Sequence, residues 1–358
     1  MRITRRKALS TILLSTLSGC SAISGRKNSP GWSAPVGSNP LTERIYVDEE
    51  YVAVTTPTGG IQLFSTDSGT PVGNNNSREN DSRYAGTPTV SVDKRFLTIT
   101  DQIHVVNDSG EEIWSESLPD GGYASIESPP VILNGLVYTT TSEGSMYQID
   151  LQQEIISEID LPPISGYWWD SRGSRVVLGT KSYDTTLCDL NSTEVLWSQS
   201  GTSLAHPCLY DTDIITSSIE SGQLNAHRVN PDTGMEQWNA SLPGIRITFC
   251  DRLSDGVLAV VSQNAWESSE PGQVTMIDAN SGTITEKYGI PPKTIPSGDV
   301  FEGTLFLTTF DGAVLSIAPE SGLRELFKYE DKISSPPTVR GENIVFGTND
   351  GQVVLIEY

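Results

Sequence analysis

The sequence is poor in the residues that metal, redox and hydrolytic sites require. Its 358 residues include 4 cysteines and 3 histidines. His104, His206 and His227 are far apart in the chain, and no CxxC, HExxH or nucleophile-elbow motif occurs. No two cysteines are adjacent. These absences argue against a metalloenzyme or a serine hydrolase, and we expect no catalytic residue, metal or cofactor.

Beyond Cys20, the chain has Cys188, Cys208 and Cys250, which are too few for a disulfide framework. Cysteine behaves as a small apolar side chain when it is buried, so we expect these three to be structural. A Cys208–Cys250 disulfide is the alternative, because both residues fall in equivalent strands of successive repeats.

A long hydrophobic run is also missing. The apolar stretch from Ala8 to Gly19 is too short to cross a bilayer core of about 30 Å as a helix. It follows Arg5 and Arg6, and TRRKALS resembles a twin-arginine export signal, while LSGC, which ends at Cys20, resembles a lipobox. We predict a signal peptide over 1–19, lipidation of Cys20, and anchoring on the extracytoplasmic side of the cell membrane. The alternative is a plain secretory signal with Cys20 incidental.

Positive charge is scarce, and lysine especially so. The chain has 8 lysines and 15 arginines against 45 acidic residues, which gives a net charge of −22. Such a surface repels nucleic acid phosphates, so we expect no nucleic acid partner. The composition resembles that of haloarchaeal proteins, in which concentrated salt screens self-repulsion. An acidic secreted protein is the simpler alternative.

What the sequence does contain is a repeat. The turn before the third strand of each unit recurs eight times, at Gly60, Gln102, Gly144, Tyr183, Gly222, Gly272, Gly312 and Gly351. The steps of 42, 42, 39, 39, 50, 40 and 39 residues are those of a four-stranded propeller blade. We predict an all-β, eight-bladed propeller of antiparallel blades over 30–358, with a tether over 20–29. Seven blades are the alternative count.

The last unit, 334–358, contains three strands where the others have four. Complete units end in an outer strand such as DSGEEIW or DTGMEQW, in which Asp108 and Asp232 are expected to form the preceding turn. GWSAPVG, residues 31–37, has the composition of such a strand and contains Trp32. We predict that it pairs with 352–358 and closes the ring, because an unpaired outer edge is unfavourable. A disordered N-terminal peptide is the alternative.

The unit PPTV…GxVYxxTxxGxxYxID…DxGxxxW resembles the pyrroloquinoline quinone (PQQ)-type repeat of eight-bladed propellers. Some propellers of this kind are quinone-dependent dehydrogenases, but those carry adjacent cysteines and a calcium site that this sequence lacks. The chain is also similar to the propeller lipoproteins of the outer-membrane β-barrel assembly machinery. That resemblance implies a non-enzymatic, lipid-anchored scaffold that binds proteins at the cell surface. A dehydrogenase-like or small-ligand- or sugar-binding propeller is the alternative.

Two segments interrupt the repeat, and both are rich in aromatic residues. GYWWD contains Tyr167, Trp168 and Trp169 at the start of the fourth unit, and SQNAWESSEPG places Trp266 in a loop of the sixth. Strands alternate in direction, so both segments are expected on the face opposite to the tether. Tryptophan and tyrosine dominate binding hot spots, so these four residues are candidates for partner binding. They could instead plug the central channel.

Overall fold

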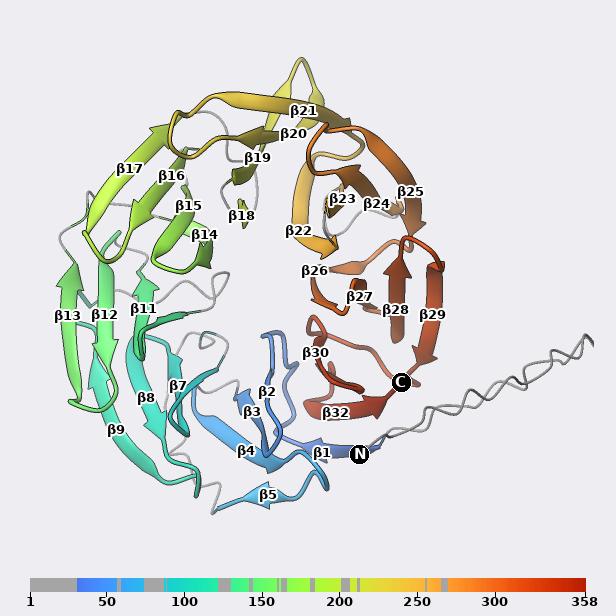
Figure 1. Ribbon diagram of the computed structural model, residues 1–358. Helices are drawn as coiled ribbons and strands as arrows, with labels where there is room; N and C mark the ends of the chain where they lie inside the picture. The colour runs from blue at the N-terminus through green and yellow to red at the C-terminus, as the bar shows by residue number, and fades with distance from the viewer. Residues whose placement is uncertain are drawn as a thin grey trace, which may run out of the picture.

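A computed structural model describes 31–56, 59–73, 87, 89–121, 130–141, 144–159, 161, 166–180, 184–200, 207–210, 213–254, 256–264 and 270–358. The described chain forms 8 antiparallel sheets of four strands each, arranged as blades around a central axis (Figure 1). The predicted fold class and blade count are confirmed. No helix in the described ranges is long and apolar enough to span a membrane.

Blades 1 to 7 each run outwards from the axis in chain order. The innermost strands are β2 (Tyr46–Val47), β6 (Val90–Val92), β10 (Val131–Leu133), β14 (Gly166–Arg172), β18 (Cys208–Tyr210), β22 (Arg246–Ser254), β26 (Thr294–Phe301) and, in blade 8, β30 (Thr338–Arg340). The second strands are β3 (Tyr51–Thr55), β7 (Arg95–Ile99), β11 (Leu136–Thr140), β15 (Arg175–Thr180), β19 (Asp213–Glu220), β23 (Val257–Gln263), β27 (Thr304–Thr309) and β31 (Asn343–Gly347).

The outer half of each blade contains the third and fourth strands. The third strands are β4 (Ile61–Ser65), β8 (Gln102–Val106), β12 (Met146–Asp150), β16 (Thr185–Asp189), β20 (Gln223–Val229), β24 (Gly272–Asp278), β28 (Ala313–Ala318) and β32 (Gln352–Glu357). The fourth strands are β5 (Pro71–Val72), β9 (Glu112–Ser117), β13 (Ile155–Ile159), β17 (Glu194–Gln199), β21 (Glu236–Leu242), β25 (Ile284–Ile290), β29 (Gly322–Lys328) and, in blade 8, β1 (Trp32–Pro35).

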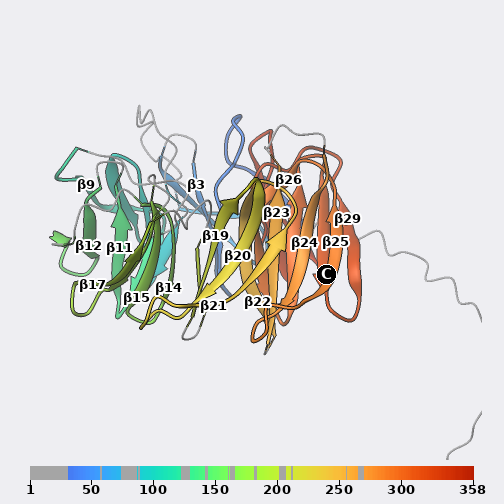
Figure 2. The same cartoon turned by 90° about the horizontal axis from the view of Figure 1, so that it is seen from above.

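The alternation of strand direction gives the disc two faces, whose turns border it at opposite ends of the strands in Figure 2. The hairpin face carries the turns between first and second strands and between third and fourth strands, such as Asn134–Gly135 and 230–235. The crossover face carries the turns between second and third strands and the links between blades, such as 221–222 and 243–245. These names are kept below.

Short side chains close the turns that lead into the outer strands on the hairpin face. Asp150 Oδ1 accepts from Gln152 N at 2.8 Å, and Asp278 Oδ1 accepts from Ser281 N at 2.8 Å. The same capping occurs at Asn107 and Asn230. Asp108 and Asp232 do lie in these turns, but the preceding asparagines supply the caps. The expectation that these aspartates are turn residues is therefore confirmed, and the capping amide oxygen lies one or two residues earlier.

The core is a set of seams, each shared by two neighbouring blades. Between blades 5 and 6, for example, Ile215, Leu224 and Leu242 pack against Leu258 and Val260, and all five are at most 1 % exposed. Side chains alternate between the two faces of a strand, so each blade contributes to the seam on either side of it. Burial between blades therefore holds the ring together.

An N-terminal strand completes the last blade, as the sequence predicts. β1 pairs antiparallel with β32 in the register Trp32↔Leu355 to Pro35↔Gln352 (Figure 1). Gly31 N also donates to Leu355 O at 2.9 Å. Because β32 runs towards the hairpin face, the start of β1 points to that face as well.

A second contact ties blade 1 to blade 7 across the inner edge of blade 8. Arg44 Nη1 donates to Asp299 Oδ1 at 3.2 Å, and the guanidinium also bonds to Gly298 O. The other carboxylate oxygen of Asp299 accepts from Val339 N at 2.7 Å. The closure of the ring is therefore reinforced at the channel as well as at the rim.

Candidate functional site on the crossover face

The aromatic segment of blade 4 forms the start of an innermost strand. Trp168 and Trp169 lie in β14, opposite Gly179 and Leu178, and the register shifts between Gly166 and Trp168. The segment begins at the crossover face, as the alternation of strands predicts. The side chains of Tyr167, Trp168 and Trp169 lie outside what the structure describes.

Trp266 in blade 6 also lies outside the described residues. The described ends of its loop are on the crossover face, where Asn264 Nδ2 donates to Glu270 Oε2. The two interruptions of the repeat are therefore attached to the same face, in blades 4 and 6, and blade 5 stands between them (Figure 1).

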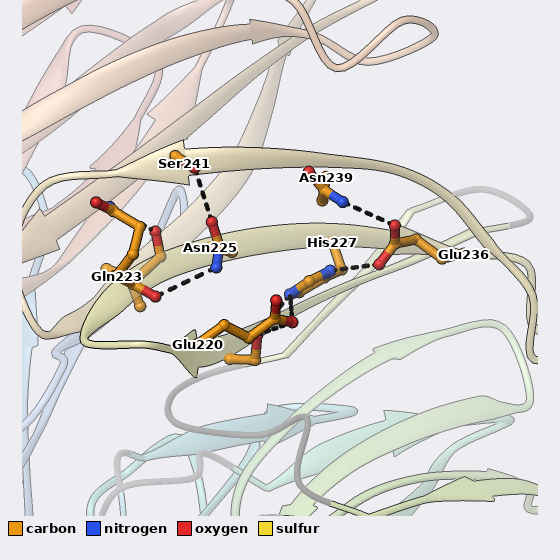
Figure 3. A network of polar contacts seen from close by, with 9 residues as sticks. Glu220, Gln223, Asn225, His227, Glu236, Asn239 and Ser241 are labelled. Atoms are coloured by element: carbon orange, nitrogen blue, oxygen red, sulfur yellow. Dashed lines mark hydrogen bonds and ion pairs between the residues drawn. The ribbon is translucent and has the colours of Figure 1, made fainter.

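Blade 5 contains a network of polar side chains centred on His227, which Figure 3 shows. His227 Nε2 lies 2.7 Å from Ser218 Oγ, and His227 Nδ1 lies 2.6 Å from Glu236 Oε2. Asn239 Nδ2 donates to Glu236 Oε1 at 2.9 Å. The histidine is 7 % exposed and links β19, β20 and β21. Its hydrogen bonds therefore connect the side chains of three adjacent strands.

A second row of the network lies nearer the crossover face. Ser241 Oγ donates to Asn225 Oδ1 at 2.8 Å, and Asn225 Nδ2 donates to Gln223 O at 3.2 Å (Figure 3). Gln223 Nε2 donates to Leu242 O at 2.6 Å. Nearly all the polar atoms of this row are paired with one another, which stiffens the hairpin between the two flanking aromatic segments.

Two of the three histidines, which are far apart in the chain, each contact a glutamate of the same blade. His104 in blade 2 repeats the contact of His227, with Nδ1 at 3.3 Å from Glu112 Oε2. In both blades the histidine lies in the third strand, and the glutamate is the first residue of the fourth strand. Burial acts to raise the pKa of Glu236, but hydrogen bonds from Asn239 and His227 and the charge of His227 outweigh it and lower that pKa. The partners were missed because only the strand register brings them together.

Ser218, His227 and Glu236 stand in the order of a serine–histidine–acid triad. Ser218 Oγ, however, also lies 3.2 Å from Glu220 Oε1, so its hydroxyl has a carboxylate as well as the imidazole within hydrogen-bond distance. A nucleophilic serine needs a hydroxyl that a substrate can reach. Ser218 is also 6 % exposed, within a strand that is paired on both sides. This arrangement fits a structural network better than a nucleophile.

The channel side of the blades carries aspartates that bond to the next blade. Asp170 Oδ2 accepts from Leu209 N at 2.8 Å. Burial raises the pKa of Asp170 to about 6, since the backbone hydrogen bonds to its carboxylate offset only part of the desolvation and the charge of Asp251 adds to it. No group of three or more metal-ligating side chains occurs in the described part of the chain.

The cysteines are structural in the described chain. Cys188 and Cys208 are buried, and Cys188, Cys208 and Cys250 are free thiols, so the alternative of a Cys208–Cys250 disulfide was wrong. Cys208 Sγ instead donates to Cys250 O at 3.0 Å. Burial raises the pKa of Cys188 to about 12 and that of Cys208 well above its usual value, which makes both thiols poor nucleophiles.

Comparison with known proteins agrees with this architecture. Residues 48–203 match a family model described as outer membrane protein assembly factor BamB. BamB from Moraxella catarrhalis has a similar structure, with 13% identity, a TM-score of 0.65, and coverage of 92% of this chain and 100% of that one. The comparison with curated protein sequences gives no match.

Two further solved structures share the fold. The computationally designed Ika8 protein matches with a TM-score of 0.69 at 13% identity, over 90% of this chain and 97% of that one. The Dos1 propeller matches with a TM-score of 0.71 at 11% identity, over 92% of this chain and 95% of that one. Identities this low show the fold and not the function. Residues 48–203 are thus similar to the repeat that this family model describes, and the described chain has the eight-bladed propeller fold.

Proposed function

We propose that this protein is a non-enzymatic, lipid-anchored scaffold on the extracytoplasmic side of the cell membrane, and that its crossover face binds a protein partner. The observation that carries the proposal is that both aromatic interruptions of the repeat join this one face, in blades 4 and 6. The other blades form the ring without such aromatic segments. Aromatic residues outside the repeat are therefore better explained by contact with a partner.

The anchor is proposed from the sequence. Arg5 and Arg6 would direct export, and Cys20 would carry the lipid. The roughly ten residues between Cys20 and Gly31 reach at most about 35 Å when extended. Since β1 begins towards the hairpin face, this face would lie near the membrane. The crossover face would then be free for a partner.

The family match supports a binding role. Its description names an assembly factor of the outer membrane, and assembly factors act through contacts with other proteins. The burial of Ser218 and the raised pKa of the Cys188 thiol fit the same view, because neither group is suited to nucleophilic attack on a substrate.

A pull-down from detergent-solubilised membranes tests the proposal. Wild type is compared with Trp168→Ala and Trp266→Ala, and with Met235→Ala as a control, since Met235 is 65% exposed near the hairpin face. We expect both tryptophan variants to lose a partner that the Met235 variant retains. An identical set of partners for all four proteins would contradict the proposal.

A further inference from the structure

Two isoleucines are exposed where the seam between blades 5 and 6 opens on the crossover face. Ile219 is 44% exposed at the end of β19, and Ile245 is 52% exposed in the link from blade 5 to blade 6. Ile219 pairs with Leu224, and Leu224 with Leu242, so all three share the face of blade 5 that packs on blade 6. Ile245 N donates to Gln263 O at the end of β23. The two side chains therefore flank the mouth of one seam, called the seam mouth below.

The seam is apolar in its interior but contains two serines near the crossover face. Deeper in, it is filled by Ile215, Leu258 and Val260. Towards the crossover face, strand alternation places Ser217 on the same side as Ile215 and Ser262 on the same side as Val260. Both hydroxyls are buried, at 2% and 1% exposure, and neither has a hydrogen-bond partner within the described chain.

An unpaired buried hydroxyl is unfavourable, by about 1–3 kcal/mol. At this seam the hydroxyls of Ser217 and Ser262 have no hydrogen-bond partner within the described chain, and the isoleucines above them are exposed to solvent. The protein alone therefore leaves both kinds of contact unmade. A partner side chain inserted between Ile219 and Ile245 would gain apolar contacts with both. It could also form hydrogen bonds with the hydroxyls of Ser217 and Ser262.

The charge at the rim selects the partner. Glu270 is exposed at the end of the blade 6 loop, where its carboxylate accepts a hydrogen bond from Asn264, just past the end of β23. Glu220 follows Ile219, but its carboxylate bonds to Ser218, which places it on the opposite side of β19. Arg246 follows Ile245 in the chain, but its cross-strand neighbour Gln263 donates to Thr294 O of blade 7, which places Arg246 on the opposite side of β22. The seam mouth is therefore apolar and bordered by the acidic side chain of Glu270.

We propose that the seam mouth binds a basic protein segment in which an apolar residue stands next to lysine or arginine. The apolar side chain packs between Ile219 and Ile245, and a cationic group pairs with Glu270. Lysine and arginine also carry long methylene stems that suit such a site. This inference rests on the proposed scaffold function and adds the chemistry of the partner.

Two fluorescent twelve-residue peptides, one alternating leucine and lysine and the other leucine and glutamate, test the inference by anisotropy with the folded protein. The site variant carries Ile219→Ser and Ile245→Ser. The control carries Ile113→Ser and Ile155→Ser, which are 38% and 48% exposed on the outer strands of blades 2 and 3. Thermal unfolding verifies that both variants fold, and Ile245→Ser alone, in a loop, replaces the double variant if it does not.

We expect the leucine–lysine peptide to bind the wild type, with Kd raised at least tenfold in the site variant and less than twofold in the control. Glu270→Gln should weaken the dependence of Kd on salt. Equal weakening in the control, or equal binding of the leucine–glutamate peptide, would overturn the inference. In that case the tryptophan-dependent pull-down would still decide the scaffold function on its own.

Discussion

The indole of Trp32 lies directly against Gly69, so that a Cβ atom added at residue 69 would be 2.4 Å from the ring. Trp32 Nε1 also donates to Thr66 O at 2.8 Å. Trp238 of blade 5 makes the same contact with blade 6, with Nε1 at 2.8 Å from Ala279 O and its ring against Gly282. The closing strand thus reproduces the regular contact between blades, although it comes from the other end of the chain.

Replacing Trp32 with alanine should destabilise the whole ring. The variant loses the packing of the indole on blade 1 and the bond to Thr66 O, which together are worth about 2–4 kcal/mol. Thermal and denaturant unfolding measure the loss. An unchanged melting temperature would show that β1 does not stabilise the ring.

Gly69→Ala tests the same contact from the other side. Gly69 has φ +66°, and Gly121 has φ +67° with nothing within 4 Å of the added Cβ, so Gly121→Ala is a matched control. Both variants carry the backbone strain of a left-handed alanine, about 1 kcal/mol. Gly69→Ala should cost at least about 1 kcal/mol more, because it displaces Trp32. Equal losses would mean that the Trp32–Gly69 contact contributes nothing.

Asp170→Asn should stabilise the protein at neutral pH. The pKa of Asp170 rises from 3.8 to about 6 on folding, chiefly because the carboxylate is desolvated. A raised carboxylate pKa opposes folding above pH 6, and this opposition disappears as the pH falls from 6 to 4. The advantage of the asparagine variant over wild type should therefore be about 1–3 kcal/mol larger at pH 8 than at pH 4. A pH-independent difference between the two proteins would argue against a desolvated carboxylate.

Ser218 should resist a fluorophosphonate probe, which labels activated serines. Ser218 is 6 % exposed and lies within a strand that is paired on both sides, so the probe has little access to its hydroxyl. Mass spectrometry after incubation should find no adduct. Labelling that disappears in both Ser218→Ala and His227→Gln, but persists in His104→Gln, would instead identify a nucleophile and refute the non-enzymatic proposal.

Cys20→Ser should release the protein from the membrane. Without the thiol the proposed lipid cannot be attached. Cell fractionation should move the variant into the soluble exported fraction, whereas Cys188→Ser, which changes a buried thiol, should remain with the membrane. Membrane association of the Cys20 variant would contradict lipid anchoring.

The repeat period made the fold predictable, whereas the contacts depend on register. The spacing of turns gives eight blades, and the missing fourth strand of 334–358 pointed to Trp32. Gly69 and Gly282 could be predicted as turn residues. Their contacts with Trp32 and Trp238 of the preceding blades could not. His227 and Glu236 meet only because a register shift between Arg228 and Val229 aligns β20 with β21. Such alignments leave no mark that can be read in one sequence.

Site-specific photo-crosslinking in intact cells tests the central claim, which is that the crossover face meets a protein partner. A benzoylphenylalanine is placed at Ile245 on the crossover face or at Met235 near the hairpin face, which are 52% and 65% exposed. We predict a discrete crosslinked protein adduct from residue 245 and none from residue 235. An adduct from residue 235 alone, or from neither position, would contradict the account.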